Sequence, residues 1–189
     1  MNQTLNQPAA KAAQADKAAS IHHRADGREW RVAVIASAWH RDIVASATAA
    51  IQAEFDRSRM PKGCLQLFEV PGAFEIPLLA QRLARGGRGG GGGGGGGFDA
   101  IIACGLVVNG GIYRHEFVAA AVIDGLMRVQ LESDVPVFSC VLTPREFHEH
   151  DAHRQFFLEH LRTKGTEVAR SCLETLARHR EVAASAMSY

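Results

Sequence analysis

Short apolar runs recur along the chain, and each is followed by a segment whose apolar positions have helical spacing. Residues 31–37 form the first nearly all-apolar run, a pattern typical of a strand that is covered on both faces. The other predicted strands are 64–70, 98–104 and 135–142. The predicted helices are 41–57, 75–85, 116–131, 151–161 and 166–178. This alternation predicts an α/β fold, a three-layer sandwich in which helices cover both faces of a four-stranded parallel sheet.

Two stretches of the 189-residue chain do not fit this pattern. Residues 1–27 are a polar lead rich in Ala, Gln and Lys, which we expect to be a disordered arm. Residues 86–97 hold eleven of the nineteen glycines and are expected to form a flexible Gly-rich insertion between a helix and a strand. The remainder, about 150 residues, suits one domain. We predict this domain at 28–180 and a C-terminal tail at 181–189.

Charge, hydropathy and cysteine usage narrow the classes of partner. The chain has 21 Lys and Arg residues against 20 Asp and Glu residues, which gives no electrostatic basis for binding nucleic acid or an anionic membrane. No apolar run approaches the roughly 18–20 residues that a membrane span needs. The four cysteines are far apart and lack any C-x-x-C pair, so neither a disulfide framework nor a zinc ribbon is indicated. We therefore expect a cytoplasmic protein.

Ligands of parallel α/β sheets bind beyond the carboxyl ends of the strands, and unusual residues of this chain stand there. Trp39, just past the first strand, could stack on a planar heteroaromatic ring or could cover the rim of the core. After the second strand, Gly72 and Ala73 allow a ligand to approach the backbone closely. Glu75 could accept hydrogen bonds from sugar hydroxyls, or it could stabilise the start of its own helix.

The third predicted strand is followed by a glycine pair at 110–111 and then by Arg114 and His115. Backbone N–H groups of a glycine pair ahead of a helix can hold a phosphate. Arg114 adds a fixed positive charge, and His115 adds a group that titrates near neutrality. This combination predicts a sugar-phosphate enzyme, and the alternative is a glycine turn before a solvated helix start.

Three histidines, at positions 148, 150 and 153, follow the fourth predicted strand. Their spacing does not suit one face of a short helix, and no carboxylate motif accompanies them. We therefore predict no metal site here and favour a polar segment that binds anions.

Three of these segments carry, in order and spacing, a resemblance to a known family. Val-Pro-Gly-Ala-Phe-Glu-Ile-Pro at 70–77, Gly-Gly-Ile-Tyr-Arg-His-Glu-Phe-Val at 110–118 and Val-Leu-Thr at 141–143 resemble the motifs of lumazine synthases, most of all those of the second, rhizobial-type branch. The resemblance covers residues 31 to about 180 and implies the flavodoxin-like lumazine synthase topology. It also implies a transferase that condenses 5-amino-6-(D-ribitylamino)uracil with 3,4-dihydroxy-2-butanone 4-phosphate to 6,7-dimethyl-8-ribityllumazine. That reaction is the penultimate step of riboflavin biosynthesis and uses no metal or organic cofactor.

The resemblance further implies roles for individual residues. Trp39 would stack on the pyrimidine, and Gly111 and Ile112 would donate backbone N–H groups to the phosphate. Ser139 falls where the family places an aromatic contact from the neighbouring subunit. The ribityl chain would be held by Ala73, Phe74 and Glu75, and the pyrimidine edge would be lined by the backbone of Leu106, Val107 and Val108.

Two positions depart from the family pattern. When the chain is aligned on residues 116–118, the position of the proton-transferring His holds Arg114, and the His stands at position 115. Either Arg114 acts there as an electrostatic stabiliser, or His115 reaches the site from a new angle. The phosphate-binding Arg of the family is replaced by His153. We expect an active but slow enzyme, with an oligomeric scaffold that binds lumazine or flavin with little turnover as the alternative.

The predicted helix at 116–131 has more apolar positions than one stripe facing a four-stranded sheet can use. Its second apolar face should meet a neighbouring subunit. The resemblance implies a homopentamer, or a decamer of two pentamers, with the small-molecule substrates bound between adjacent subunits.

Overall fold

The computed structural model describes residues 22–86, 97–109, 114–144, 147 and 151–186. Its four strands pair in parallel in the order β2-β1-β3-β4. The strands are β1 (Val32–Ser37), β2 (Leu65–Val70), β3 (Ala100–Leu106) and β4 (Val137–Leu142). The helices are α2 (Arg41–Arg57), α3 (Ile76–Arg85), α4 (His115–Ser133) and α5 (Asp151–Ala186), with a short 3₁₀ turn, η1 (Ala73–Glu75), before α3.

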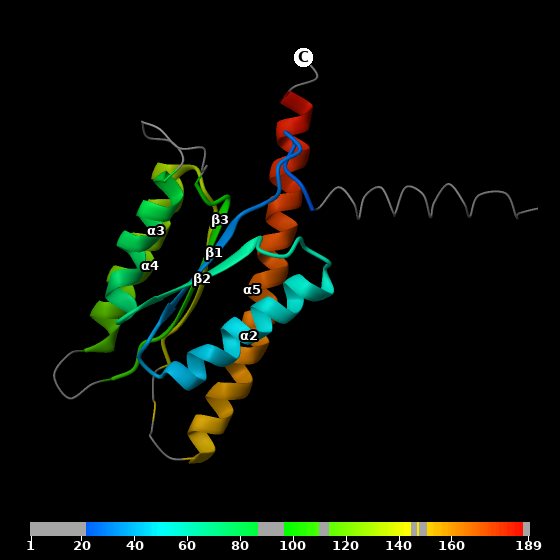
Figure 1. The fold of residues 1–189 in the computed structure, drawn as a ribbon. Helices are drawn as coiled ribbons and strands as arrows, with labels where there is room; N and C mark the ends of the chain where they lie inside the picture. Colours follow the sequence, from blue (N-terminus) through cyan, green and yellow to red (C-terminus); the bar gives the residue numbers. More distant parts are fainter. Residues whose placement is uncertain (1–21, 87–96, 110–113, 145–146, 148–150, 187–189) are drawn as a thin grey trace, which may run out of the picture.

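The sheet separates two layers of helices, as predicted. Helices α2 and α5 lie on one face of the sheet, and α3 and α4 lie on the other (Figure 1). The central strands β1 and β3 are buried at every position, because each is flanked by strands and covered by helices on both faces. Successive side chains of these strands therefore point alternately into two separate cores, one on each face of the sheet. The predicted α/β three-layer fold is confirmed.

The two helices predicted at 151–161 and 166–178 are a single helix, α5, which continues to Ala186. The prediction divided it near Gly165, but this glycine does not end the helix. A Cβ atom at Gly165 would stand 2.4 Å from the carbonyl oxygen of Ala47, so the absent side chain is what lets α5 cross closely over α2. The helix also runs through the domain end predicted at residue 180, so part of the predicted tail is helical.

Contacts to the domain begin inside the predicted N-terminal arm. Arg24 forms an ion pair with Asp99, which directly precedes β3, and the backbone N–H of Arg31 donates to the same carboxylate at 2.9 Å. These contacts join the segment before β1 to the start of β3 at the amino ends of the strands. Within the described residues, no helix is long and apolar enough to cross a membrane.

Candidate functional site

The carboxyl ends of the four strands lie along one edge of the sheet. Strand pairing continues one residue past each pair of ends, because Ala38 N–H donates to Val70 O and Val107 N–H donates to Leu142 O, both at 2.8 Å. From β1 the chain crosses first to β2 on one side and later to β3 on the other. The ends of β1 and β3 therefore flank the point where the strand order reverses, which is the place where such folds bind ligands.

Trp39 lies at this edge with its indole in solvent. The side chain is 70% exposed, directly after the last hydrogen bond between β1 and β2. The next residue, His40, takes the left-handed conformation (φ 51°, ψ 45°), which turns the chain sharply into α2. The indole thus does not fill the rim of the core, and its faces are open to a planar ligand.

The turn after β2 presents an aromatic ring and a carboxylate. Phe74 is 59% exposed, while Ala73 packs against the core on the α3 side of the sheet. The Oε2 atom of Glu75 accepts a hydrogen bond of 2.9 Å from the backbone N–H of Gly72, so the carboxylate stabilises the start of its own helix. Glu75 is also exposed, which leaves its carboxylate accessible from solvent.

The segment after β3 brings His115 against Asn109. His115 is the first residue of α4 and is only 8% exposed, and its Nδ1 lies 2.5 Å from Oδ1 of Asn109. The carboxylate of Glu116 is more distant, at 3.6 Å from the same nitrogen. Arg114 precedes the helix in an extended conformation and is exposed. Asn109 was not among the residues predicted from the sequence, although an amide shortly after a strand and just before a glycine pair was a usable signal.

The three residues whose backbone is expected to line the pyrimidine edge lie at the end of β3 and directly after it. Leu106 and Val107 are buried, and Val108 is half-buried against the core on the α5 side. Gly111 and Ile112, the expected phosphate donors, lie outside the described residues.

The segment after β4 returns to the end of β1. The ring of Phe147 meets His40 edge-on at 4.9 Å, and Arg154 of α5 forms a 2.5 Å ion pair with Asp42 of α2. His153 is half-buried and contacts the ring of Phe157 at 5.8 Å between centroids. Its two predicted neighbours at 148 and 150 are outside the described residues, and the part of the chain that is described holds no metal-binding group of three or more His, Cys, Asp or Glu side chains.

Ser139 is set apart from the other predicted residues. It is exposed on the edge strand β4, three residues before the strand ends, and its hydroxyl accepts from the backbone N–H of Val141 at 3.3 Å. Strand β3 separates it from β1 and therefore from Trp39.

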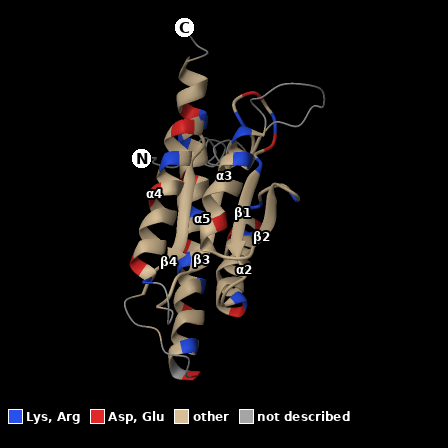
Figure 2. Cartoon of the chain, turned by 90° about the vertical axis from the view of Figure 1, so that its left-hand side faces the viewer, with Lys and Arg blue, Asp and Glu red and all other residues tan. Residues whose placement is uncertain are grey.

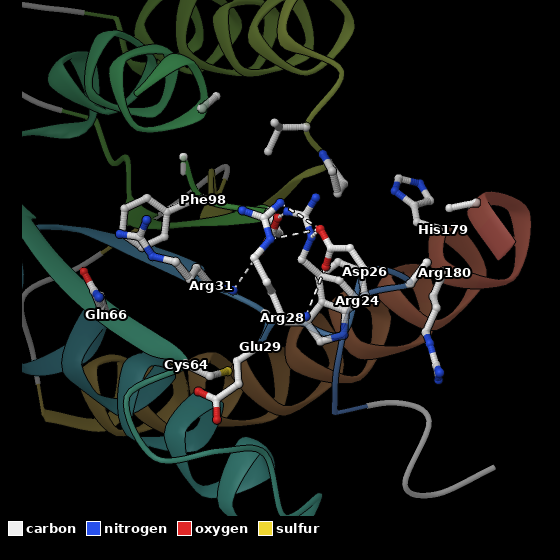
Figure 3. Close-up of a pocket in the computed structure, with 18 of the residues that line it drawn as sticks. Arg24, Asp26, Arg28, Glu29, Arg31, Cys64, Gln66, Phe98, His179 and Arg180 are labelled. Carbon is white, nitrogen blue, oxygen red and sulfur yellow. Dashed lines mark hydrogen bonds and ion pairs between the residues drawn. The ribbon is translucent and has the colours of Figure 1, made fainter. Parts of the chain in front are cut away.

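A cavity of about 960 Å³ lies at the opposite, amino end of the sheet. None of the predicted site residues that the structure describes lines it. Figure 3 shows Arg24, Asp26 and Arg28 turned toward one another inside it, and both arginines form ion pairs with Asp26. Together with the Arg24–Asp99 pair, these contacts make the cavity a site of structural ion pairing between the segment before β1 and the sheet.

A three-layer α/β sandwich with strand order β2-β1-β3-β4 and a ligand edge of this composition defines a flavodoxin-like class of protein. Within that class, the family model for 6,7-dimethyl-8-ribityllumazine synthase matches residues 29–180. The chain belongs to the lumazine synthase family.

Curated relatives agree with this assignment. The 6,7-dimethyl-8-ribityllumazine synthase of Rhodococcus erythropolis is 55% identical over 141 residues, which are 75% of this chain and 85% of that protein. The 6,7-dimethyl-8-ribityllumazine synthase 2 of Bradyrhizobium diazoefficiens is 48% identical over 157 residues, 83% of this chain and 88% of the relative. The protein of the same name from Pseudomonas syringae pv. tomato is 47% identical, with 80% and 84% covered. The similarity to proteins named synthase 2 agrees with the second branch predicted from the motifs.

Proposed function

We propose that the chain is a 6,7-dimethyl-8-ribityllumazine synthase, which joins 5-amino-6-(D-ribitylamino)uracil to 3,4-dihydroxy-2-butanone 4-phosphate. The observation that carries the proposal is the edge at the ends of β1 and β3. At this edge the indole of Trp39 is exposed just after β1. The neighbouring strand β3 leads to the buried imidazole of His115, which contacts Asn109. A flat acceptor surface and an oriented proton-transfer group are what the condensation of two small molecules requires.

In this proposal the pyrimidine stacks on Trp39, and backbone groups of Leu106, Val107 and Val108 bind its edge. The ribityl chain lies along the turn at 73–75, where Ala73 leaves space, Phe74 supplies an exposed ring and Glu75 accepts from hydroxyl groups. The contact between Gly72 N–H and Oε2 of Glu75 supports this role, because it fixes the carboxylate while the group stays exposed.

The phosphate of the second substrate is proposed to bind ahead of α4, at the backbone N–H groups of Gly111 and Ile112. The start of a 19-residue helix attracts an anion, and Arg114 adds positive charge next to it. His153 is the proposed replacement for the phosphate-binding Arg of the family.

We assign proton transfer to His115 and electrostatic stabilisation to Arg114. An Asn Oδ1 atom can only accept, so its contact with Nδ1 requires a proton on that nitrogen and leaves the lone pair of the neutral ring on Nε2. The family motif also supports this assignment when it is counted from Gly111 instead of Gly110, since a His four residues on is then His115. No metal or organic cofactor has a part in the proposed reaction.

We further propose a homopentamer, or a decamer of two pentamers, with Ser139 directed to the site of the neighbouring subunit. The support is the outer face of α4, which is uncharged between Glu116 and Asp124 (Figure 2). This face leaves four large apolar side chains in solvent, namely Phe117, Ile123, Met127 and Leu131. A surface of this kind is typical of a subunit interface. All four cysteines are free thiols, which supports a location in the reducing cytoplasm.

The alternative function is an oligomeric scaffold that binds lumazine or flavin with little turnover, and the exposed Trp39 would serve it equally well. The two are separated by measuring lumazine formation from both substrates alongside a fluorescence titration with riboflavin. An enzyme gives a saturable rate above the uncatalysed reaction, whereas a scaffold binds riboflavin and leaves that rate unchanged.

A further inference from the structure

Two cysteines that are distant in sequence lie side by side on adjacent strands of the sheet. Cys104 of β3 and Cys140 of β4 are direct partners in the parallel register. Both side chains belong to the core on the α2 and α5 side of the sheet, where they are 0% and 2% exposed. Neighbouring strands are about 4.8 Å apart. That spacing lies inside the roughly 4.4–6.8 Å between Cα atoms that a disulfide spans. The spacing of the two backbones is therefore compatible with a disulfide between these residues.

The two sulfur atoms are chemically unequal. The thiol of Cys104 donates a hydrogen bond to the sulfur of Cys140, which lowers the pKa of Cys140 and raises that of Cys104. Burial opposes the lowering at Cys140 and adds to the rise at Cys104, while the ammonium of Lys164 favours the Cys140 thiolate and Glu167 disfavours it. Cys140 is thus the sulfur with more thiolate character, and the thiolate is the form that attacks an oxidant.

The other two cysteines differ from this pair. Burial raises the pKa of Cys64 to about 12 and also raises the pKa of Cys172. Neither has a cysteine as its register partner on a neighbouring strand, since Cys64 directly precedes β2 and Cys172 lies in α5, although Cys64 is near enough to add to the raised pKa of Cys172. They are matched controls, being equally buried thiols in the same chain.

A small groove is lined in part by Cys140, whose side chain is 2% exposed. A groove of about 310 Å³ between β4 and α5 is lined by Cys140 together with Phe138, Ser139, Leu142, Lys164 and Glu167. Because β4 is an edge strand, the groove opens at the side of the sheet. Its volume admits a small oxidant such as a hydroperoxide.

We propose that Cys104 and Cys140 are a redox modification site at which a hydroperoxide forms a reversible cross-strand disulfide. When the hydroperoxide is hydrogen peroxide, the Cys140 thiolate attacks one of its oxygens, the sulfur–oxygen bond forms as the O–O bond breaks, and the released hydroxide takes up the proton that Cys140 had lost, giving water. The thiol of Cys104 then attacks the sulfenic sulfur of Cys140, forming the S–S bond and releasing a second water. Two thiols are oxidised and one hydroperoxide is reduced. The bond would join β3 to β4 two residues before Leu106 and Leu142, directly beneath the proposed pyrimidine edge.

The test treats the folded full-length protein with hydrogen peroxide, blocks remaining thiols, and maps the cross-linked peptides by mass spectrometry with and without dithiothreitol. The proposal expects the loss of two hydrogen atoms per chain, a peptide pair joining Cys104 to Cys140, and reversal by the reductant. Cys140→Ser should slow thiol consumption at least about tenfold, whereas Cys64→Ser and Cys172→Ser should leave it within about twofold of wild type.

Three outcomes would overturn the proposal. They are a bond between Cys64 and Cys172, a bond between two chains, and four blocked thiols after a treatment that oxidises the denatured chain. The peptide map of the wild type decides among them even if a serine variant fails to fold. None of these outcomes bears on lumazine formation by the reduced protein.

Discussion

The Nδ1 atom of His115 lies 2.5 Å from Oδ1 of Asn109, six residues earlier in the chain. Asn109 follows the end of β3, and His115 begins α4. The contact fixes the plane of a buried imidazole at the carboxyl edge of the sheet and directs its second nitrogen away from the amide. An oriented base of this kind transfers protons at a defined point, which is the basis for assigning that role to His115.

Removal of His115 and removal of Arg114 should affect catalysis differently. His115→Ala is expected to lower kcat by about 10²-fold or more and to flatten the pH dependence of the rate, measured between about pH 6 and 8, because the proton-transferring side chain is lost. Arg114→Ala should reduce kcat/KM at every pH and leave the profile unchanged in shape. Steady-state rates across this pH range check both variants. Equal, small losses of rate in the two variants would indicate that substrate binding alone accounts for the catalysis.

Asn109 is expected to act as a positioning residue. Asn109→Ala should lower kcat about tenfold with little change in KM, since the imidazole loses its orientation but the ligand contacts stay. Asn109→Asp keeps an oxygen acceptor at the same place and should recover most of the rate. If the Asp variant is as slow as the Ala variant while both keep the wild-type circular dichroism spectrum, the hydrogen bond does not orient the ring.

Trp39→Ala should weaken riboflavin binding by about 1–3 kcal/mol, which corresponds to about 5- to 150-fold in Kd, because a stacking platform is lost. The indole is 70% exposed, so the fold should be unaffected. Trp39→Phe retains a ring and is the matched control. A fluorescence titration measures the affinity, and an unchanged Kd for the Ala variant would remove Trp39 from the site.

A charge on the outer face of α4 should dissociate the assembly. Ile123→Glu and Ala120→Glu place a carboxylate among exposed apolar side chains of this helix, and we expect smaller particles and loss of activity together. Thr163→Glu, which adds the same charge on the exposed side of α5, should leave the assembly intact. Sedimentation velocity distinguishes the cases, and a wild-type monomer of 20.4 kDa with full activity would contradict the proposed interface.

The ion pairs at the amino end of the sheet predict opposite pH effects on stability. Burial raises the pKa of Asp99 above its usual 3.8, although Arg24 and the N–H of Arg31 act against the rise. The folded chain therefore holds this proton more tightly than the unfolded chain, and the stability from Asp99 is full below pH 3.8 and is lost as the pH rises through the folded pKa. The unfolding free energy of wild type relative to Asp99→Asn should thus fall as the pH rises from 3.8 through the folded pKa toward neutrality.

Asp26 is the control for this sign. Its hydrogen bonds to Arg28 lower its pKa, so its contribution is present above pH 3.8 and is lost as the pH falls through the folded pKa. The unfolding free energy of wild type relative to Asp26→Asn should accordingly rise, or stay constant, as the pH rises. Urea denaturation over this pH range measures the difference in unfolding free energy between wild type and each Asn variant. The same pH slope for both differences would contradict the assigned directions of the two pKa shifts.

The sequence predicted the sheet and the edge that carries the site because both depend on local patterns. The buried strands β1 and β3 have nearly all-apolar sequences, and Trp39, Glu75 and His115 stand in the segments that follow three of the strands. The single long helix α5 was missed because Gly165 resembles a helix end in sequence, whereas its role is a contact with Ala47 of another helix. Contacts between distant segments leave no local pattern.

The same reason explains what the site prediction lacked. The pairing of Asn109 with His115 depends on how the chain turns between β3 and α4, and the pairing of Cys104 with Cys140 depends on strand register. The motif identified Ser139 as a candidate site residue. That β3 separates Ser139 from Trp39 follows only from the strand order.

The central claim is tested most directly by the initial rate of 6,7-dimethyl-8-ribityllumazine formation from the two purified substrates, followed by absorbance with and without the protein. The account predicts a rate that saturates in both substrates, exceeds the uncatalysed reaction, and falls at least about 10²-fold in His115→Ala. A rate equal to that of the buffer control, in a protein that still binds riboflavin, would contradict it.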